Sequence, residues 1–374
     1  MAILFVWIFH PPYLPYKAYQ VLNVTVVLGL FAYATSQQIG KKSIYILIYG
    51  IIIIVSTYVA RGFGVEIVYG SLQTIFIYNI FIITQNAVRR YGSYGAIKIL
   101  KKICLAYLCV TDALIIAGVS HVIDGEVVYL CGNKFGVAYM HLIFLALQMS
   151  SNEFIHRSKI RYTLSWILMC AGSGLICLMV DCTTGVVGSV FMMISMFTLK
   201  RVQKLMIRPT AFLVFFIAVN FLIVGTRVFF SGSSISNLLI DIFNDDFTML
   251  GRYRIYDKIS MIISQKLFLG YGYNSSIVEE IVGFGNAQNG ILHIWVQYGI
   301  FGALAFLLIC VTAIKNIEIR LNTIFPILLM VYIFVVISTI EINFSNEFFL
   351  LLSLLYTPKT LEVHHEIQRN TANI

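Results

Sequence analysis

Nearly continuous apolar runs of about 15 to 25 residues constrain the fold of this chain more than any other feature. They do not alternate with a period of two, as the strands of a membrane β-barrel do, so the runs predict helices. Charged residues make up only 11% of the sequence, whereas a soluble domain carries roughly 25%. The sequence therefore predicts an all-α integral membrane protein and excludes a soluble globular domain, because spanning segments must satisfy their own backbone hydrogen bonds.

About eleven helices (10–12) are expected to span the membrane. Their approximate bounds are 18–36, 43–60, 63–83, 102–120, 135–150, 162–180, 184–199, 209–226, 288–313, 322–340 and 344–357. The segment 1–16 is also apolar but contains three prolines, at positions 11, 12 and 15. It is interpreted as a re-entrant or interfacial piece, or as the remnant of another span.

The basic residues orient these helices. Threading the loops on alternate sides places 18 of the 26 Lys and Arg residues on one side, which the positive-inside rule makes cytoplasmic. This bias accounts for the net charge of +9 without a nucleic-acid partner. The resulting regions are N-terminal transmembrane helices (1–226), a large extracytoplasmic loop (227–287), C-terminal transmembrane helices (288–357) and a cytoplasmic tail (358–374).

The extracytoplasmic loop at 227–287 is about 60 residues long, whereas the other loops of the chain are short. Loops of this length are usually functional. Within it, Ile255, Ile259, Ile262 and Ile263 recur at helical spacing. They predict an amphipathic helix resting on the membrane surface or on the helix bundle. A glycine-rich turn, LFLGYGYNSS at 267–276, follows this helix.

Several cations lie on the outer side, where topology does not require them. The candidates are Arg61, Lys134, Arg227, Arg252 and Arg254. A guanidinium group donates two parallel hydrogen bonds to phosphate oxygens, so these residues predict an anionic ligand, such as a diphosphate, at the outer membrane face. The alternative interpretation is that each side chain reaches separately toward lipid headgroups.

Three further polar residues fall in or near the apolar segments. Asp112 lies within the fourth span, where a carboxyl group is either functional or a packing element that ties helices together. His141 lies in a span and His293 near the start of one, and each is either a packing residue or a base. The sequence contains no DxD, no HExxH and no glycine-rich phosphate loop, so neither a metal nor a cofactor is expected.

Residues 285–309, GNAQNGILHIWVQYGIFGALAFLLI, resemble the helix that follows the large external loop in O-antigen polymerases and O-antigen ligases. The positions that match the family pattern are Asn289, Leu292, Gln297, Gly299 and Gly302. Residues 251–275 resemble the loop of that family, with a Gly-Arg, an amphipathic helix and a Gly-x-Gly. Residues 132–142 and 183–188 resemble stretches of capsule and exopolysaccharide polymerases.

This resemblance implies a metal-independent, inverting glycosyltransferase that uses no cofactor. Its substrates would be oligosaccharide repeat units on undecaprenyl diphosphate, and its product a surface polysaccharide such as O-antigen, capsule or exopolysaccharide. The resemblance places the protein in the bacterial cytoplasmic (inner) membrane, with the active site facing the extracytoplasmic side. Partners would include membrane lipid, a flippase and a chain-length regulator.

The outer-face cations and the family resemblance together predict two groups of site residues. The expected catalytic residues are Arg61, Arg227, Arg252 and His293, and the expected substrate-binding residues are Lys134, Arg254, Gln288 and Asn289.

One position departs from the family pattern. Gln288 stands where the family has a histidine, and glutamine cannot act as a base at neutral pH. His293, a carboxylate or positioning alone would then replace that function, and the departure favours a polymerase over a ligase. A flippase or other transporter of lipid-linked oligosaccharides is the rival of a different class, although the deep spans hold almost no Lys or Arg.

Overall fold

The computed structural model describes residues 1–9, 16–37, 43–123, 125–151, 159–195, 197–198, 200–230, 246–315, 317 and 321–356. Its N-terminal helices are α1 (Ala2–Ile8), α2 (Tyr16–Thr35), α3 (Ile44–Arg61), α4 (Val65–Ile116) and α5 (Lys134–Ser150). The middle helices are α6 (Lys159–Met179), α7 (Thr183–Ser195), α8 (Lys200–Met206) and α9 (Pro209–Phe230). The last are α11 (Asp246–Gln265), α12 (Ile277–Val282), α13 (Gly290–Ile314), α14 (Leu321–Ile337) and α15 (Asn346–Leu355).

The helical membrane class that the sequence predicts agrees with the lengths and apolarity of these helices. In the described part of the chain, three helices are long and apolar enough to cross a membrane, at Lys17–Thr35, Ile44–Arg61 and Gly290–Ile314. A fourth arises if α8 and the start of α9, bent by 85°, count as one span. Helices α6, α7, α14 and α15 contain shorter apolar stretches. The number of about eleven spans therefore stays a prediction.

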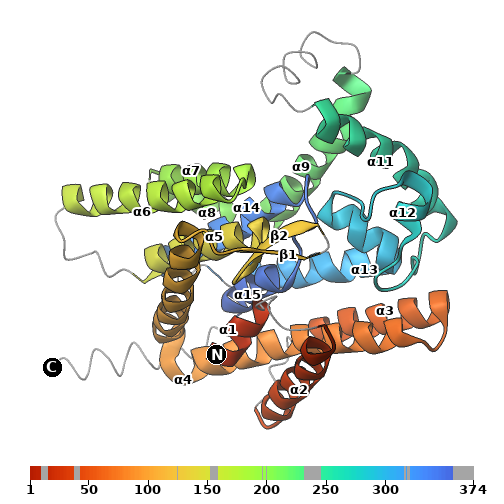
Figure 1. The fold of residues 1–374 in the computed structure, drawn as a ribbon, viewed down its shortest axis with the longest axis horizontal. Coiled ribbons are helices and arrows are strands. Elements are labelled where there is room, and N and C mark those ends of the chain that lie inside the picture. The colour runs from red at the N-terminus through yellow and green to blue at the C-terminus, as the bar shows by residue number, and fades with distance from the viewer. Residues whose placement is uncertain are drawn as a thin grey trace.

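The surface of the bundle is itself apolar. Large side chains such as Val21 on α2, Ile51 on α3 and Leu168 on α6 are exposed by 69%, 59% and 63%. Water would penalise such continuous apolar surface, whereas lipid tails accommodate it. The core lies instead along α5, which is buried from Val137 to Leu147, and is surrounded by α4, α6, α7 and α14 (Figure 1).

Helix α4 differs from the sequence interpretation. The sequence predicts two spans, 63–83 and 102–120, with a basic loop between them. The structure has two helical segments that meet at a kink, and the basic residues between the predicted spans are helical on both sides of it. The kink is at Gly92, with φ 71° and ψ 165°, a conformation that glycine adopts without a Cβ clash. Lys101 on the second half is buried, and its Nζ donates to Ser151 Oγ at 3.3 Å. This bond joins the second half of α4 to the end of α5.

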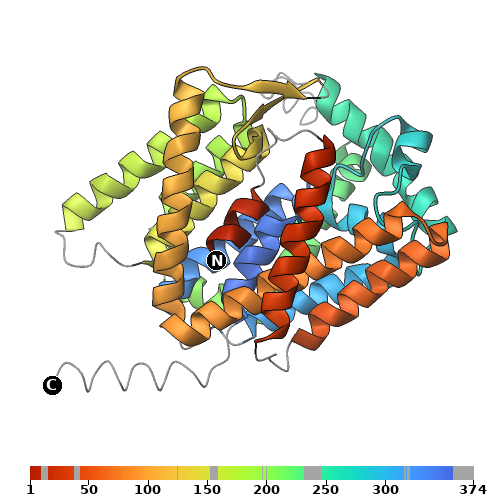
Figure 2. The same ribbon diagram turned by 60° about the horizontal axis from the view of Figure 1, so that its bottom comes forward.

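A small antiparallel sheet corrects the expectation of helices alone. Strands β1 (His121–Ile123), β2 (Glu126–Tyr129) and β3 (Gly132–Asn133) pair in sequence order between α4 and α5. Gly125, with φ 83°, lies in the turn between the first two strands, where a positive φ favours glycine. Figure 2 shows the hairpin projecting beyond the ends of the neighbouring helices.

The residues of the predicted amphipathic helix lie within α11. The four isoleucines at 255, 259, 262 and 263 are at most 9% exposed, while Lys258 on the opposite face is exposed. They pack in one cluster with Val278 of α12, with Val296 of α13, and with Ala287, which precedes α13. Of the two supports that the sequence left open, α11 therefore rests on the protein, beside α12 and α13 (Figure 1).

Candidate functional site

The glycine-rich turn packs against a break in α13. Gly299 has φ 67° and ψ −171°, so the helix is interrupted between residues 298 and 300. The chain at 267–272 lies along this break and supplies the missing partners. Tyr271 N donates to Val296 O at 2.9 Å, Gly272 N to Gln297 O at 2.8 Å, and Ile300 N to Leu267 O at 2.9 Å.

Two glycines are required for this close approach. A Cβ at Gly299 would meet the carbonyl of Phe268, and one at Gly270 would meet the carbonyls of Val296 and Gln297. Both residues also have positive φ, 67° in each case, which L side chains rarely adopt. The Gly-x-Gly and Gly-x-x-Gly patterns of the sequence therefore encode one contact between two backbones.

Helix α3 fixes the other side of the turn. The Ser56 hydroxyl contacts the carbonyl of Leu269 and lies 2.9 Å from that of Gln297, and Thr57 Oγ1 accepts a hydrogen bond from Tyr273 N at 3.0 Å. Both hydroxyl residues are fully buried. Polar bonds in such an apolar setting are rigid because their partners have no water to exchange with. The positions of Tyr273 and Asn274 are thus set by α3 and α13 together.

A cavity of about 270 Å³ lies behind this turn. Its polar lining comes from Gln73 of α4, Tyr273 and Asn274 of the turn, and His293 and Gln297 of α13. The Nδ1 atom of His293 is buried and has no hydrogen-bond partner within the described residues. Because buried polar atoms are nearly always paired, this nitrogen is a candidate for contact with a ligand.

Arg61 does not line this cavity, but it contacts Asn274, which does. It is the last residue of α3, and its Nη2 donates to the carbonyl of Asn274 at 3.3 Å. Its Nη1 lies 3.4 Å from Glu66 Oε1, and the two side chains are 25% and 40% exposed. Asn274 has a φ of 53°, which is uncommon outside glycine and clusters at functional sites. Of the predicted catalytic residues, His293 thus lines the cavity, and Arg61 contacts one of its lining residues, Asn274.

Asn289 and Gln288 build the start of α13. Asn289 is fully buried and caps the helix, with its Oδ1 accepting from Leu292 N at 3.0 Å. Its Nδ2 donates to Asn220 Oδ1 of α9 at 3.1 Å. Gln288 has a φ of 48° and donates through Nε2 to Asn286 Oδ1 at 3.0 Å. These contacts hold the start of the helix that carries His293, and the substrate-binding role expected for the two amides stays a prediction.

The remaining predicted cations do not contribute described side chains to this cavity. Arg227 belongs to α9, and Arg252 and Arg254 belong to α11, but the side chains of all three lie outside the described residues. Arg252 precedes Tyr256 by one helical turn, and the Tyr256 hydroxyl donates to the carbonyl of Gln288 at 3.2 Å. Lys134 begins α5 beside the hairpin, where its Nζ lies 5.7 Å from the centre of the Phe135 ring.

Among the cavity residues that the sequence did not point to are Gln73, Tyr273 and Asn274. Gln73 is an amide inside a long apolar helix, and such polar residues within membrane segments are often functional. Its Nε2 donates to Asn346 Oδ1 at 3.0 Å, across to the start of α15. Tyr273 and Asn274 carried no comparable signal, because only the folded turn brings them to the cavity.

Asp112 and His141 form a separate polar cluster. His141 Nε2 lies 3.1 Å from Asp112 Oδ1, and its Nδ1 lies 3.3 Å from Ser173 Oγ. The three residues come from α5, α4 and α6 in turn. This cluster ties three helices together, as the packing interpretation of Asp112 expects.

A comparison with protein-family models identifies one match, described as O-antigen ligase, over residues 166–307. The matched segment holds His293, the glycine-rich turn and the positions of Arg227 and Arg252, whereas Arg61 and Gln73 lie before it. No curated protein and no solved structure matches the chain. The match supports a place for this chain in the O-antigen polymerase and ligase superfamily.

Proposed function

We propose that this member of the O-antigen polymerase and ligase superfamily is a polysaccharide polymerase. It joins oligosaccharide repeat units carried on undecaprenyl diphosphate into a surface polysaccharide. The reaction takes place on the outer face of the bacterial cytoplasmic membrane. The observation that carries this proposal is the cavity lined by His293, whose buried Nδ1 has no partner among the described residues, and by Asn274, which Arg61 contacts.

His293 accepts the proton of the acceptor hydroxyl in this proposal. The acceptor oxygen attacks the anomeric carbon of the donor chain, a new C–O bond forms, and the bond from that carbon to the lipid diphosphate breaks. Attack from the face opposite the leaving group inverts the anomeric centre. A positioned base of this kind typically contributes 10²- to 10⁴-fold to a rate.

Arg61 stabilises the diphosphate that leaves. Its guanidinium carries a fixed positive charge and can exchange its bonds to Glu66 and Asn274 for phosphate oxygens. Arg227 and Arg252 are proposed to add further positive charge, and Lys134 and Arg254 to contact the substrate. This set of cations carries out the charge stabilisation without a divalent ion, so the mechanism is proposed to be metal-independent.

The geometry favours His293 over Gln288 as the base. Gln288 occupies the position of the family's histidine, but its side-chain amide is bonded to Asn286. His293 lies one helical turn further along the same segment and lines the cavity. Its backbone N donates to Asn289 O at 2.9 Å, so the cap of α13 holds it in place.

A ligase is the second candidate, because the matching family model is described as O-antigen ligase. A ligase would move a finished chain to a different acceptor, using the same donor chemistry. Both enzymes would receive lipid-linked units from a flippase, and a polymerase would in addition work with a chain-length regulator.

Deletion of the gene distinguishes these functions. We expect the deletion to collapse the ladder of polysaccharide lengths to a single repeat unit, and wild-type protein to restore it. Inserted Arg227→Ala and Arg252→Ala variants are expected not to restore it. Long polymer that persists without attachment to its acceptor would instead identify a ligase. Lipid-linked units accumulating on the cytoplasmic face would identify a flippase and overturn the proposal.

A further inference from the structure

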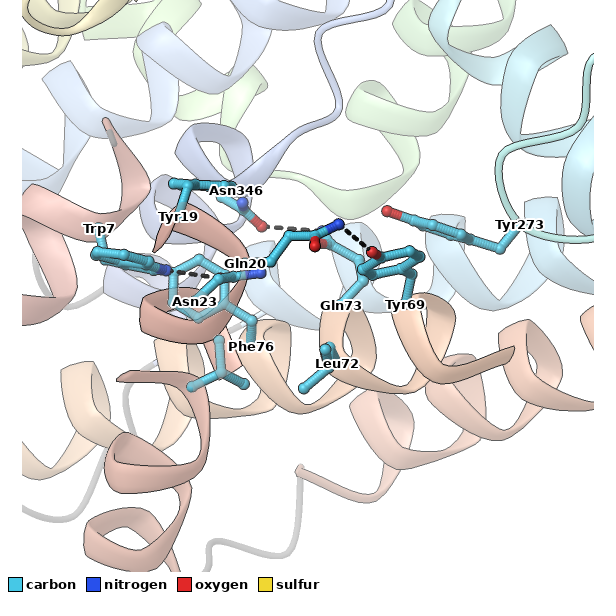
Figure 3. Close-up of a pocket in the computed structure, with 11 residues that line it drawn as sticks. Trp7, Tyr19, Gln20, Asn23, Tyr69, Leu72, Gln73, Phe76, Tyr273 and Asn346 are labelled. Atoms are coloured by element: carbon cyan, nitrogen blue, oxygen red, sulfur yellow. Dashed lines mark hydrogen bonds between the residues drawn. The ribbon is translucent and has the colours of Figure 1, made fainter. Parts of the chain in front are cut away.

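A second cavity, of about 310 Å³, lies between the N-terminal helices and the glycine-rich turn. Trp7 of α1, Gln20 and Asn23 of α2, Gln73 of α4 and Asn346 of α15 contribute to its lining (Figure 3). Its volume is at the lower end of the range, about 300–1,000 Å³, that is usual for small-molecule sites. Ten of its eleven lining residues lie outside the segment that matches the O-antigen ligase model, and Tyr273 is the exception.

Three side-chain hydrogen bonds organise this cavity. Trp7 Nε1 donates to Asn23 Oδ1 at 2.9 Å, Gln20 Nε2 to the Tyr69 hydroxyl at 2.6 Å, and Gln73 Nε2 to Asn346 Oδ1 at 3.0 Å. Each amide has a second polar atom that these bonds do not use. The amino groups of Asn23 and Asn346 are donors, and the carbonyl oxygens of Gln20 and Gln73 are acceptors. The cavity thus combines both kinds of group, which match the hydroxyls of a sugar.

Aromatic rings supply the complementary surface. The rings of Trp7 and Tyr19 stack with their centres 5.9 Å apart and their planes within 9° of each other. Tyr69, Phe76 and Tyr273 also line the cavity, and none of the eleven lining residues is charged. Flat aromatic faces suit the C–H face of a pyranose ring, whereas a buried carboxylate without a cation would be strongly penalised.

The two cavities adjoin. Gln73 and Tyr273 line both of them, so a group in the second cavity lies next to a group beside His293. Figure 3 shows Tyr273 reaching toward Tyr69 and Gln73 from the turn. A chain of linked sugars can therefore occupy the two cavities with consecutive residues.

We propose that this second cavity binds an uncharged sugar residue next to the reacting sugar and selects against acidic sugars at that position. The proposal rests on the proposed function, in which the cavity at His293 holds the reacting hydroxyl. The N-terminal helices, which the family model does not cover, then set the specificity for one residue of the repeat unit.

The three tryptophans of the chain allow a direct test. A Trp166→Phe, Trp295→Phe variant of the full chain leaves Trp7 as the single tryptophan. The purified variant is titrated in detergent with the methyl glycosides of glucose, galactose and N-acetylglucosamine, and with methyl glucuronide. We expect saturable quenching of Trp7 fluorescence by at least one neutral glycoside and at least tenfold weaker binding of the glucuronide.

Asn23→Ala and Gln73→Ala are expected to weaken the binding of the neutral glycoside at least tenfold. The matched control is Asn86→Ala, since Asn86 is an exposed amide on α4 whose Nδ2 contacts the Tyr33 hydroxyl at 3.4 Å. It is expected to leave binding unchanged. As a second readout, the neutral glycoside should raise the unfolding temperature of the wild-type chain, because a ligand that binds the folded state stabilises it.

Three outcomes would overturn the proposal. One is that no neutral glycoside changes either the fluorescence or the unfolding temperature, as a cavity filled by water or by a lipid chain would give. Another is equal binding of the glucuronide, and the last is an equal effect of Asn23→Ala and Asn86→Ala. Because binding is measured without turnover, its failure is distinct from failure of the polymerase proposal, which the polysaccharide ladder decides.

Discussion

His141 of α5 and His293 of α13 both lie in apolar helices but have different environments in the structure. The ring of His141 contacts Asp112 at 3.1 Å through one nitrogen and Ser173 at 3.3 Å through the other. The ring of His293 has a buried Nδ1 with no partner in the described part of the chain, and it lines a cavity of about 270 Å³.

The hydrogen bonds of the two rings distinguish a histidine that packs helices together from one that is a candidate base. A polar group in an apolar interior is stable only when it is paired, so a cluster in which both ring nitrogens are bonded is complete. A histidine that lines a cavity and has an unpaired ring nitrogen is not completed in this way by the described residues. Both residues are histidines in apolar helices, so the sequence alone does not distinguish a packing role from a catalytic one. The hydrogen-bond partners of each ring make that distinction.

The largest effect is expected from His293→Ala. Removal of the proposed base should lower the rate of polymer formation by about 100-fold or more. The unfolding temperature should also fall, because truncation of a buried ring leaves a cavity, so the rate is compared per folded molecule. The rate is measured with purified protein and lipid-linked repeat units. A His293→Ala protein that polymerises at the wild-type rate would remove the distinction between the two histidines.

The next largest effect is expected from Arg61→Ala. Loss of one charged group that stabilises the leaving diphosphate should lower the rate by about 10²-fold. Arg61→Lys keeps the charge but not the two-pronged geometry, so it should fall between Arg61→Ala and the wild type. Arg90→Ala is the matched control, since Arg90 is an exposed arginine on α4 that stacks over Tyr91. Equal rates for Arg61→Ala and Arg90→Ala would show that Arg61 only reaches toward solvent or headgroups.

The sequence predicted the class of the fold and several of its elements for clear physical reasons. An apolar run in lipid must satisfy its own backbone hydrogen bonds and therefore forms a helix. The isoleucines of α11 recur at helical spacing and therefore form one buried face. The sequence also identified Arg61 and His293 as candidates. It did not predict that the basic residues on both sides of the kink at Gly92 are helical, or that a short sheet precedes α5. Both features depend on local backbone preferences that the hydropathy pattern does not contain.

The cavity itself could not be predicted, because it depends on contacts distant in sequence. Tyr273 reaches it only because Thr57, more than two hundred residues earlier, holds its backbone N. Asn289 matched the family pattern in the sequence and was expected to bind substrate, but its side chain is fully buried against Asn220 and Leu292. A sequence motif identifies candidate residues, whereas the fold shows which of their side chains contact a cavity and which contact other residues of the protein.

A smaller effect on the rate is expected from Gly299→Ala. The added methyl group would meet the carbonyl of Phe268, and the positive φ would be strained in addition. Strain of this kind costs about 1–3 kcal/mol, and it should displace the turn that carries Tyr273 and Asn274. We expect a lower unfolding temperature and a partial loss of activity per folded molecule. Gly29→Ala is the control, because a Cβ at this position of α2 meets no atom within 4 Å.

An unchanged unfolding temperature in Gly299→Ala would show that the break in α13 is not required for the contact with the turn. A stable but fully active variant would further show that the turn tolerates displacement. Either result would weaken the argument that the turn defines the environment of His293.

The smallest effect on the rate is expected from substitutions in the His141 cluster, and this test completes the comparison. Asp112→Ala leaves the Nε2 atom of His141 buried without its carboxyl partner, which should cost about 1–3 kcal/mol of folding stability. Asp112→Asn keeps an oxygen acceptor at the same distance from the ring and should cost less. Because the cluster ties α4, α5 and α6 together away from the proposed base, the rate per folded molecule should stay within about twofold of wild type. Thermal unfolding in detergent and the polymerisation rate, each normalised to folded protein, separate the two effects. A stable Asp112→Asn protein without activity would show that the cluster participates in proton transfer, and the contrast between the two histidines would then be one of role within the reaction.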